Sequence, residues 1–303
     1  MDIDNKRITV SLVLGSGGAR GMAHIGVIRE LERNGFDIKS ISGCSIGAVI
    51  GGVFAAGKLD EFEQWVCAID KVDIVSLLDI SFRKGGLVKG DKIINTLKKL
   101  VGDQNIEDLP IPYTAIAADV KNEKEVWINS GCLFDAIRAS ISLPLFFTPV
   151  KHEDTYLVDG GVLNPVPIAP TFNDKTDLTI AVNLAGSVDE IAKLKMQSSK
   201  TDIEAEASQS DIQLNIKNFI GRLKTNTRNS VDGWGSYNIA TEAFDAMQST
   251  IARAKLAAYP PDITIELARN TCGTFEFHLA SQLIELGRTK TRESLRKAGM
   301  SVG

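Results

Sequence analysis

The sequence predicts an α/β protein in which a mostly parallel sheet lies between two layers of helices. The main observation is that short apolar runs alternate along the chain with segments whose apolar residues repeat at helical spacing. A second observation is that glycine loops separate the first runs from the helices that follow them. Strands and helices that alternate in this way form parallel sheets with helices on both faces.

The first half of the chain supplies most of these elements. A strand is predicted at Ile8–Leu14, a compact apolar run that leads into a glycine loop. A helix is predicted over Met22–Asn34, where Ile25, Ile28 and Leu31 fall at helical spacing. The next predicted elements are a strand near Ser40–Ser42, helices at Ile46–Ala56 and Leu59–Ile69 (Asp60 as N-cap), strands at Tyr113–Ala118, Glu125–Ile128, Tyr156–Val158 and Asp177–Leu184, and a helix at Leu133–Ser140.

The character of the chain changes after Gly186. The stretch 187–230 is rich in Ser, Asp, Lys, Gln and Asn and is interpreted as a long polar surface insertion. Regular structure resumes with a helix at Ile239–Ala258, which two prolines terminate, and a strand at Ile263–Leu267. A last helix is predicted to begin at about Phe275.

These segments are expected to form one domain over residues 1–303. Its core covers about 8–184, the polar insertion about 187–230, and a C-terminal extension of helices and a strand about 236–303. The apolar content of 44% is ordinary for a chain with a full core. A net charge of −4 argues against nucleic-acid binding, which usually requires a basic excess.

The N-terminal residues, the lengths of the apolar runs and the cysteines suggest a location. Residues 1–7 are polar, and the apolar run after them is too short for a signal-peptide core. No stretch approaches the roughly 20 apolar residues of a membrane span. The four cysteines are scattered and contain no C-x-x-C pair, which is typical of small buried residues in a reducing compartment. We therefore expect a cytoplasmic protein.

The sequence Gly43-Cys44-Ser45-Ile46-Gly47 matches the nucleophile motif G-x-S-x-G. It lies between a predicted strand and an apolar helix, which is the context that holds a serine on a tight strand-to-helix turn. The helix dipole points at the serine and favours a developing negative charge. Ser45 is the candidate nucleophile, and a chance occurrence of the string is the alternative.

The segment Gly15-Ser16-Gly17-Gly18-Ala19-Arg20-Gly21 connects the first strand to the first helix. It lacks the Gly-Lys-Ser/Thr end of a phosphate-binding P-loop and the spacing of a dinucleotide fingerprint. Two interpretations stay open, a plain tight turn or an oxyanion hole formed by the amides of Gly17 and Gly18, with Ile46. Arg20 would either add positive charge or brace the loop.

A nucleophilic serine needs a base. The chain has only three histidines, and none lies in a segment suited to present it: His24 is expected to pack or to brace the loop, and His152 to face solvent. His278 alone comes late, as the order Ser…Asp…His would require. Asp159, which follows an apolar strand and precedes Gly160 and Gly161, is the better candidate, although Asp-Gly is usually a turn.

In combination, these motifs resemble the patatin-like phospholipase family, in particular its compact bacterial members and the catalytic domain of neuropathy target esterase. The glycine loop 15–21, the elbow 43–47 and Asp159-Gly160-Gly161 occur in the family's order. Arg138–Pro144, followed by Pro149, looks like the family's Ser/Pro-rich block. The resemblance covers about Ile8 to Leu184 firmly and the remainder loosely.

The resemblance implies a three-layer α/β/α fold and a Ser45–Asp159 dyad that hydrolyses acyl esters of phospholipids or lysophospholipids. It implies a lipid ester as partner and neither a cofactor nor a metal. One departure is Ser16, where many members have glycine, and this puts the substrate preference in doubt. A malonyl-type acyltransferase is disfavoured because it carries His where this chain has Cys44. The alternative to an enzyme is a non-catalytic or regulatory lipid-binding protein with the same fold.

A last candidate feature is an apolar stripe within the polar insertion. Its members repeat at helical spacing, with basic residues beside them. An amphipathic helix here would give peripheral contact with a membrane, whereas packing on the protein's own sheet or on a second subunit is the alternative. The stripe consists of Ile212, Ile216, Phe219, Ile220 and Leu223.

Overall fold

The computed structural model describes residues 7–69, 71–77, 88–189, 236–300 and 302. In this part of the chain, eight strands form one sheet, in which neighbouring strands follow the order β5-β6-β3-β2-β1-β7-β8 and β4 also pairs with β3. The strands are β1 (Thr9–Leu14), β2 (Asp37–Cys44), β3 (Tyr113–Asp119), β4 (Lys124–Ile128), β5 (Val150–His152), β6 (Thr155–Asp159), β7 (Leu178–Gly186) and β8 (Ile263–Ala268).

The pairs that connect β3, β2, β1, β7 and β8 are parallel, whereas β4, β5 and β6 pair antiparallel. The sheet is therefore mostly parallel, and the predicted fold class is confirmed. The helices are α1 (Ala23–Arg33), α2 (Ile46–Ala55), α3 (Leu59–Ala68), α4 (Lys71–Ser76), α5 (Asp91–Val101), α6 (Leu133–Ser140), α9 (Ser236–Ala258) and α10 (Ala280–Lys297). Short 3₁₀ turns include η1 (Gly18–Met22), η4 (Gly160–Val162) and η6 (Phe277–Leu279).

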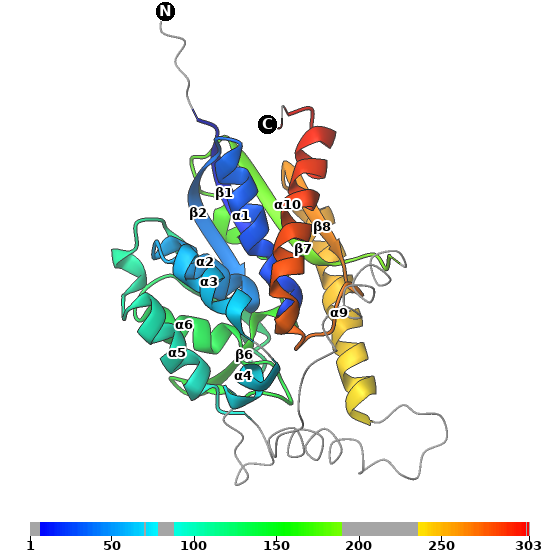
Figure 1. Ribbon diagram of the computed structural model, residues 1–303. Coiled ribbons are helices and arrows are strands. Elements are labelled where there is room, and N and C mark those ends of the chain that lie inside the picture. The colour runs from blue at the N-terminus through cyan, green and yellow to red at the C-terminus, as the bar shows by residue number, and fades with distance from the viewer. Residues whose placement is uncertain (1–6, 70, 78–87, 190–235, 301, 303) are drawn as a thin grey trace, which may run out of the picture.

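Side chains of β1 alternate between two helical layers, as the pleat of a strand requires. Val10, Leu12 and Leu14 belong to the large core cluster beneath α1, α2 and α10. Val13 belongs to a smaller cluster on the opposite face, together with Ala252 of α9. Figure 1 shows α1 and α10 side by side on one face of the sheet and α9 on the other. This is a three-layer α/β/α arrangement.

The C-terminal segment is an integral part of this core. β8 pairs in parallel with β7, and Ile265 and Leu267 are buried in the same cluster as the first strand. α10 packs along α1 so closely that a Cβ on Gly26 would lie 1.9 Å from the carbonyl oxygen of Ile284. The core expected over 8–184 therefore extends to the last helix.

Several boundaries differ from the prediction. β2 begins at Asp37, three residues earlier than expected, and α10 begins at Ala280, after η6. Asp60 is not the N-cap of α3: Lys58 holds that position without a side-chain hydrogen bond, and Asp60 pairs with Arg29 of α1. Most of the polar insertion, including the apolar stripe at 212–223, lies outside the described residues.

The register of β3 positions the candidate catalytic residues. Ala115 and Ile116 pair with β2 on one edge and with β4 on the other, and the next three residues pair with β6 and β4. β2 and β6 therefore follow one another along the same edge of β3. Cys44 is opposite Ile116 and Asp159 is opposite Ala117, so the end of β2 and the end of β6 meet.

Candidate active site

Ser45 occupies the turn between β2 and α2, as the motif predicts. Its backbone lies at φ 56 and ψ −123, an uncommon conformation for a residue with a side chain. The turn is tight because α2 starts against the end of β1: a Cβ on Gly47 would lie 2.1 Å from the carbonyl oxygen of Leu14. Such strain is held by the surrounding packing and is typical of functional sites.

The Ser45 hydroxyl donates a hydrogen bond of 2.5 Å to Oδ2 of Asp159. The other carboxylate oxygen, Oδ1, accepts a hydrogen bond of 2.7 Å from the amide of Gly161, in the 3₁₀ turn η4. Asp159 is 1% exposed and Ser45 is 9% exposed, so the carboxylate is shielded and the hydroxyl lies at the surface of a pocket. The structure thus brings the two predicted catalytic residues into direct contact.

The environment of Asp159 makes its carboxylate more basic. Burial raises the pKa of Asp159 to about 6, and the hydrogen bonds from Ser45 and Gly161 oppose part of this shift. A carboxylate with a pKa near 6 remains ionised at neutral pH and accepts a proton more readily than an exposed aspartate.

The glycine loop lies beside this pair. Gly18 has a φ of +56, and a Cβ there would lie 2.6 Å from the carbonyl oxygen of Thr274. The amides of Gly17 and Gly18 donate to none of the residues that the structure describes, and both glycines line the same pocket as Ser45. Ile46 is absent from the described lining of this pocket, and its amide is at the free N-terminal end of α2.

Arg20 is 4% exposed and is held by main-chain oxygens. Its guanidinium donates to the carbonyl of Arg269 at 2.6 Å and of Cys272 at 3.5 Å, and lies 3.6 Å from the carboxylate of Asp245. These bonds favour the bracing role, because they tie the glycine loop to the segment after β8 and to α9. They leave the oxyanion role of Arg20 without direct support.

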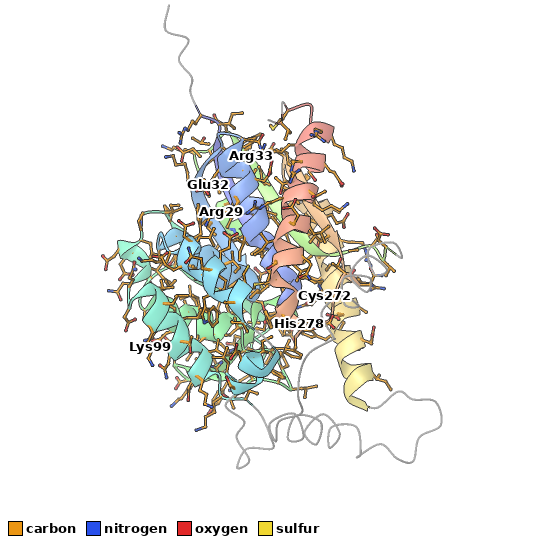
Figure 2. The ribbon with its side chains drawn as sticks, viewed as in Figure 1. Arg29, Glu32, Arg33, Lys99, Cys272 and His278 are labelled. Atoms are coloured by element: carbon orange, nitrogen blue, oxygen red, sulfur yellow. The ribbon has the colours of Figure 1, made fainter. Side chains whose placement is uncertain are left out.

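No histidine is among the described side-chain hydrogen-bond partners of Ser45 or Asp159. Nε2 of His24 is 2.8 Å from the carbonyl oxygen of Gly15, so His24 braces the glycine loop as expected. Burial lowers the pKa of His24 to about 4, partly opposed by the Gly15 bond, and the ring is neutral. His152 is exposed on β5, and His278 lies in η6 just before α10 (Figure 2). No histidine is among the described residues that line the pocket.

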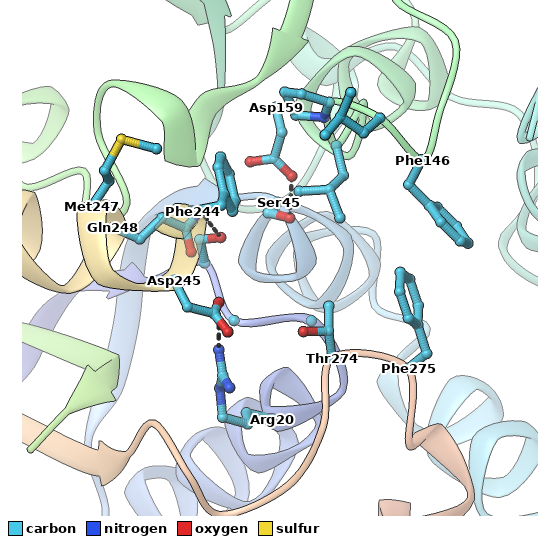
Figure 3. A pocket seen from close by; sticks show the side chains of 16 residues that line it. Arg20, Ser45, Phe146, Asp159, Phe244, Asp245, Met247, Gln248, Thr274 and Phe275 are labelled. Carbon is cyan, nitrogen blue, oxygen red and sulfur yellow. Dashed lines mark hydrogen bonds and ion pairs between the residues drawn. The ribbon is translucent and has the colours of Figure 1, made fainter. Parts of the chain in front are cut away.

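The pocket has a volume of about 210 Å³, and two kinds of wall flank Ser45 (Figure 3). Phe146 and Phe275 stack on one side with ring centroids 4.2 Å apart. α9 forms the other side, where Gln248 donates a hydrogen bond of 3.2 Å to the Ser16 hydroxyl. The described lining residues are Ser16, Gly17, Gly18, Arg20, Ser45, Leu143, Pro144, Leu145, Phe146, Asp159, Phe244, Asp245, Met247, Gln248, Thr274 and Phe275.

The remaining motif glycines lie where the sequence places them. Gly15 follows β1, Gly21 lies in η1, Gly43 in β2, and Gly160 and Gly161 in η4. Most of the pocket-lining residues that sequence analysis missed lie on α9 and in the loop after β8. These residues are far from the motifs in sequence, and no local pattern distinguishes them from core or surface residues.

One missed residue is Ser140, at the end of α6. Its hydroxyl accepts a hydrogen bond of 2.9 Å from the Ser45 amide and donates one of 2.6 Å to the carbonyl of Ile116. The sequence signal for Ser140 is its place in the segment Arg138–Pro144, but that segment does not indicate which groups the Ser140 hydroxyl bonds.

The described ranges contain no group of three or more His, Cys, Asp or Glu side chains arranged to hold a metal ion. Within the same ranges, no helix has the length and apolar character needed to cross a bilayer.

Comparison with known proteins identifies relatives. The model of the patatin-like phospholipase family matches residues 12–172, more than half of the chain. An uncharacterized NTE family protein of Mycobacterium tuberculosis is 38% identical over 327 residues, covering 94% of this chain and 91% of that protein. A lysophospholipase of Emericella nidulans is 31% identical over 189 residues, which cover 60% of this chain and 12% of that protein. Among solved structures, VipD from Legionella pneumophila matches with a TM-score of 0.48 at 15% identity, covering 96% of this chain and 67% of that one.

Proposed function

Because the chain belongs to the patatin-like phospholipase family and is a lipid ester hydrolase, we propose that it cleaves acyl esters of phospholipids or lysophospholipids through a Ser45–Asp159 dyad. The observation that carries the proposal is the hydrogen bond of 2.5 Å from the Ser45 hydroxyl to the buried Asp159 carboxylate. The apolar pocket wall and the raised pKa of Asp159 support it.

In the first step Asp159 accepts the proton of the Ser45 hydroxyl as the serine oxygen attacks the ester carbonyl carbon. The resulting oxyanion is stabilised by main-chain amides of Gly17 and Gly18, and of Ile46 at the start of α2. The tetrahedral intermediate then collapses, and the carbon–oxygen bond to the lipid alcohol breaks. Asp159 returns the proton to the leaving alcohol, and the acyl group remains on Ser45.

The second step restores the enzyme. Asp159 accepts a proton from water, and the hydroxide oxygen attacks the carbonyl carbon of the acyl-enzyme. The bond to Ser45 breaks, the serine oxygen takes back the proton from Asp159, and a fatty acid leaves. One carboxylate therefore serves as base and as acid in each half-reaction, the role that histidine has in a triad.

The two walls of the pocket suggest how the substrate lies. We place the acyl chain against the apolar segment Leu143–Phe146 and Phe275, because these side chains offer no hydrogen-bonding group. The head-group side then faces α9, where Asp245 and Gln248 are polar.

The same proposal includes peripheral contact with a membrane from the cytoplasmic side. Leu145, Met247 and Phe275 are 68%, 56% and 37% exposed and surround the pocket. A water-borne enzyme that takes a lipid from a bilayer needs such an apolar surface next to its active site.

The test compares Ser45→Ala, Asp159→Ala and the double variant on a short-chain nitrophenyl ester and on a lysophospholipid. Each single variant should lose at least about 10⁴-fold in kcat, and the double variant should lose no more, because the two residues share one chemical step. Fatty acid release, followed by mass spectrometry, identifies the bond that is cleaved.

Ser42→Ala is the matched control, since Ser42 is a buried serine of β2 whose hydroxyl bonds none of the described residues. It should keep wild-type activity. Substantial activity in Asp159→Ala combined with loss in His278→Ala would restore a triad. An intact but inactive wild-type protein that binds lipid would favour the non-catalytic alternative.

A further inference from the structure

Ser140 lies at a break in the hydrogen-bond ladder between β2 and β3. In a parallel pair, alternate residues of one strand donate to alternate carbonyls of its neighbour. The Ile41 amide donates to the Pro112 carbonyl at 2.9 Å. If the ladder continued for four more residues on each strand, the Ser45 amide would donate to the Ile116 carbonyl.

The hydroxyl of Ser140 occupies that rung. It accepts from the Ser45 amide at 2.9 Å and donates to the Ile116 carbonyl at 2.6 Å, which uses both capacities of a hydroxyl group. Ser140 is fully buried, so water does not compete for these bonds in the folded protein. The Ser140 hydroxyl therefore bridges the Ser45 amide and the Ile116 carbonyl in place of a direct bond between them.

The same turn also holds the base. The main-chain carbonyl of Ser142 accepts a hydrogen bond of 2.9 Å from the Asp159 amide. Arg138 fixes this turn by donating to the Ser142 hydroxyl at 2.6 Å and to the Thr148 carbonyl at 2.9 Å. The backbones of both dyad members are therefore tied to one turn at the end of α6.

We propose that Ser140 is a positioning residue of the active site, whose hydroxyl replaces the last rung of the β2–β3 ladder and thereby holds Ser45 at the elbow, opposite Asp159. Without this hydroxyl, the Ser45 amide and the Ile116 carbonyl face each other unpaired. Closing the gap would continue the ladder and draw Ser45 toward β3, away from its position against Asp159. This inference rests on the proposed dyad chemistry.

The test is Ser140→Ala, with Ser249→Ala as the matched control. Ser249 is a buried helical serine whose hydroxyl also donates to a main-chain carbonyl, that of Ala185, and accepts from Arg253. Both variants should lower the melting temperature. Only Ser140→Ala should lower kcat on a soluble ester, by about 100-fold with little change in KM, because a small misplacement of a reacting group has an effect of this size.

The pH profile gives a readout that a purely structural role would not change. The Ser45 hydroxyl bond lowers the pKa of Asp159. If Ser140→Ala separates the two groups, the acid limb of kcat/KM should move to higher pH, and labelling by a fluorophosphonate should slow in parallel. Ser140→Cys, of nearly the same shape but with weaker hydrogen bonds, should fold and show an intermediate kcat.

Two results would overturn the inference. The first is a wild-type kcat together with an unmoved acid limb in Ser140→Ala or, if that variant does not fold, in Ser140→Cys. The second is a loss of kcat in Ser249→Ala equal to that in Ser140→Ala. Ser45→Ala in the same assay separates this failure from failure of the dyad. An active Ser45→Ala would refute the proposed chemistry itself. An inactive Ser45→Ala beside a fully active Ser140→Ala would refute only the positioning role.

Discussion

Asp159 is the residue whose ionisation should set the working pH of the enzyme. As the proposed base, it must be deprotonated, and burial raises its pKa to about 6. We therefore expect kcat/KM on a soluble, uncharged ester to rise as the pH increases through about 6 and to level off above. A pH–rate profile with a single acid limb would agree, and an activity unchanged from pH 5 to 8 would contradict it.

The same group should influence stability in the opposite direction. Since its pKa is 3.8 in an ordinary setting and about 6 here, the folded protein binds this proton more tightly than the unfolded chain does. The stabilisation that Asp159 contributes to the folded protein is fully present below its ordinary pKa of 3.8. It is lost as the pH rises through the folded-state pKa of about 6. Asp159→Asn serves as the control, because its melting temperature should lack this component of the pH dependence.

The sequence predicted the two residues of the proposed dyad, which the structure places in hydrogen-bond contact, since each lies within a short motif whose glycines restrict the local backbone. It did not predict Ser140 as the partner of the Ser45 amide, or Gln248 as the partner of Ser16. These contacts depend on the register of β3 and on the packing of α9. Both are set by residues distant in the chain, which no local pattern encodes.

At the scale of elements, α9 and the loop after α6 form opposite sides of the pocket mouth. We expect Leu145→Ser, Met247→Ser and Phe275→Ser each to weaken binding to liposomes by about tenfold, since each removes an apolar side chain that the bilayer would cover. The measurement is vesicle co-sedimentation in a Ser45→Ala background, in which the proposed mechanism predicts no turnover.

Phe172→Ser is the control for these variants, because Phe172 is 57% exposed, packs against Tyr259 and lies outside the described pocket lining. It should leave binding unchanged. The loss of liposome binding in Leu145→Ser, Met247→Ser and Phe275→Ser should depend little on salt concentration, because the contact is apolar. Full binding by a variant that combines Leu145→Ser, Met247→Ser and Phe275→Ser would rule out this surface and would favour membrane contact through the stripe at 212–223.

The elements that sequence analysis predicted best are those with strong apolar runs or helical periodicity, such as β1, α1 and α6. β5 was missed because it is three residues long, and its pairing with β6, not its composition, makes it a strand. α5 carries a buried stripe of Ile94, Leu97 and Val101 that periodicity could have revealed. α10 was predicted to start too early because η6 continues its pattern.

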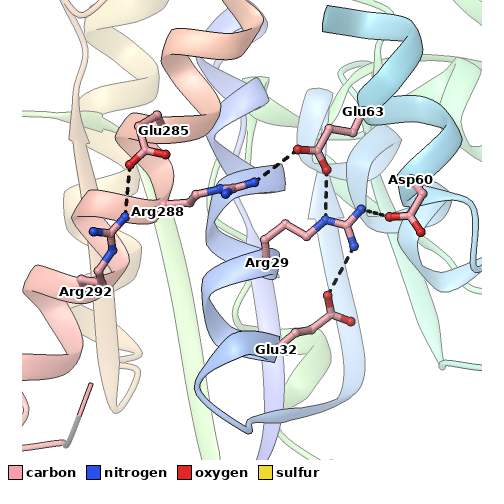
Figure 4. A network of polar contacts seen from close by, with 7 residues as sticks. All are labelled: Arg29, Glu32, Asp60, Glu63, Glu285, Arg288 and Arg292. Atoms are coloured by element: carbon pink, nitrogen blue, oxygen red, sulfur yellow. Dashed lines mark hydrogen bonds and ion pairs between the residues drawn. The ribbon is translucent and has the colours of Figure 1, made fainter. Parts of the chain in front are cut away.

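Across the whole molecule, a polar network joins the first helix to the last (Figure 4). Arg29 of α1 lies at its centre, 3.0 Å from Glu63 and 3.6 Å from Glu32, and also pairs with Asp60 of α3. Arg288 of α10 reaches Glu63 at 3.4 Å. Three helices that are distant in sequence are thus connected on the outer surface of one helical layer.

Glu63→Gln should lower the melting temperature by about 2 °C, because it removes the carboxylate that Arg29 and Arg288 share and a loss of about 1 kcal/mol is typical of a partly exposed network. The difference should shrink in high salt, since screening weakens the wild-type pairs. Glu293→Gln, which breaks an isolated exposed pair with Lys290, should have a smaller effect. Equal melting temperatures for Glu63→Gln and wild type at low salt would show that the network adds nothing.

The meeting of β2 and β6 on one edge of β3 has a kinetic consequence. Ser45 and Asp159 are 114 positions apart in the chain, and three strands must pair in register before they touch. Contacts of such large sequence separation form slowly, because the intervening loop must close before any pairing energy is gained. Helices such as α1 and α2 form from local contacts on a much shorter timescale. During refolding, esterase activity should therefore return after the helical circular dichroism signal, as one of the last properties that the chain recovers.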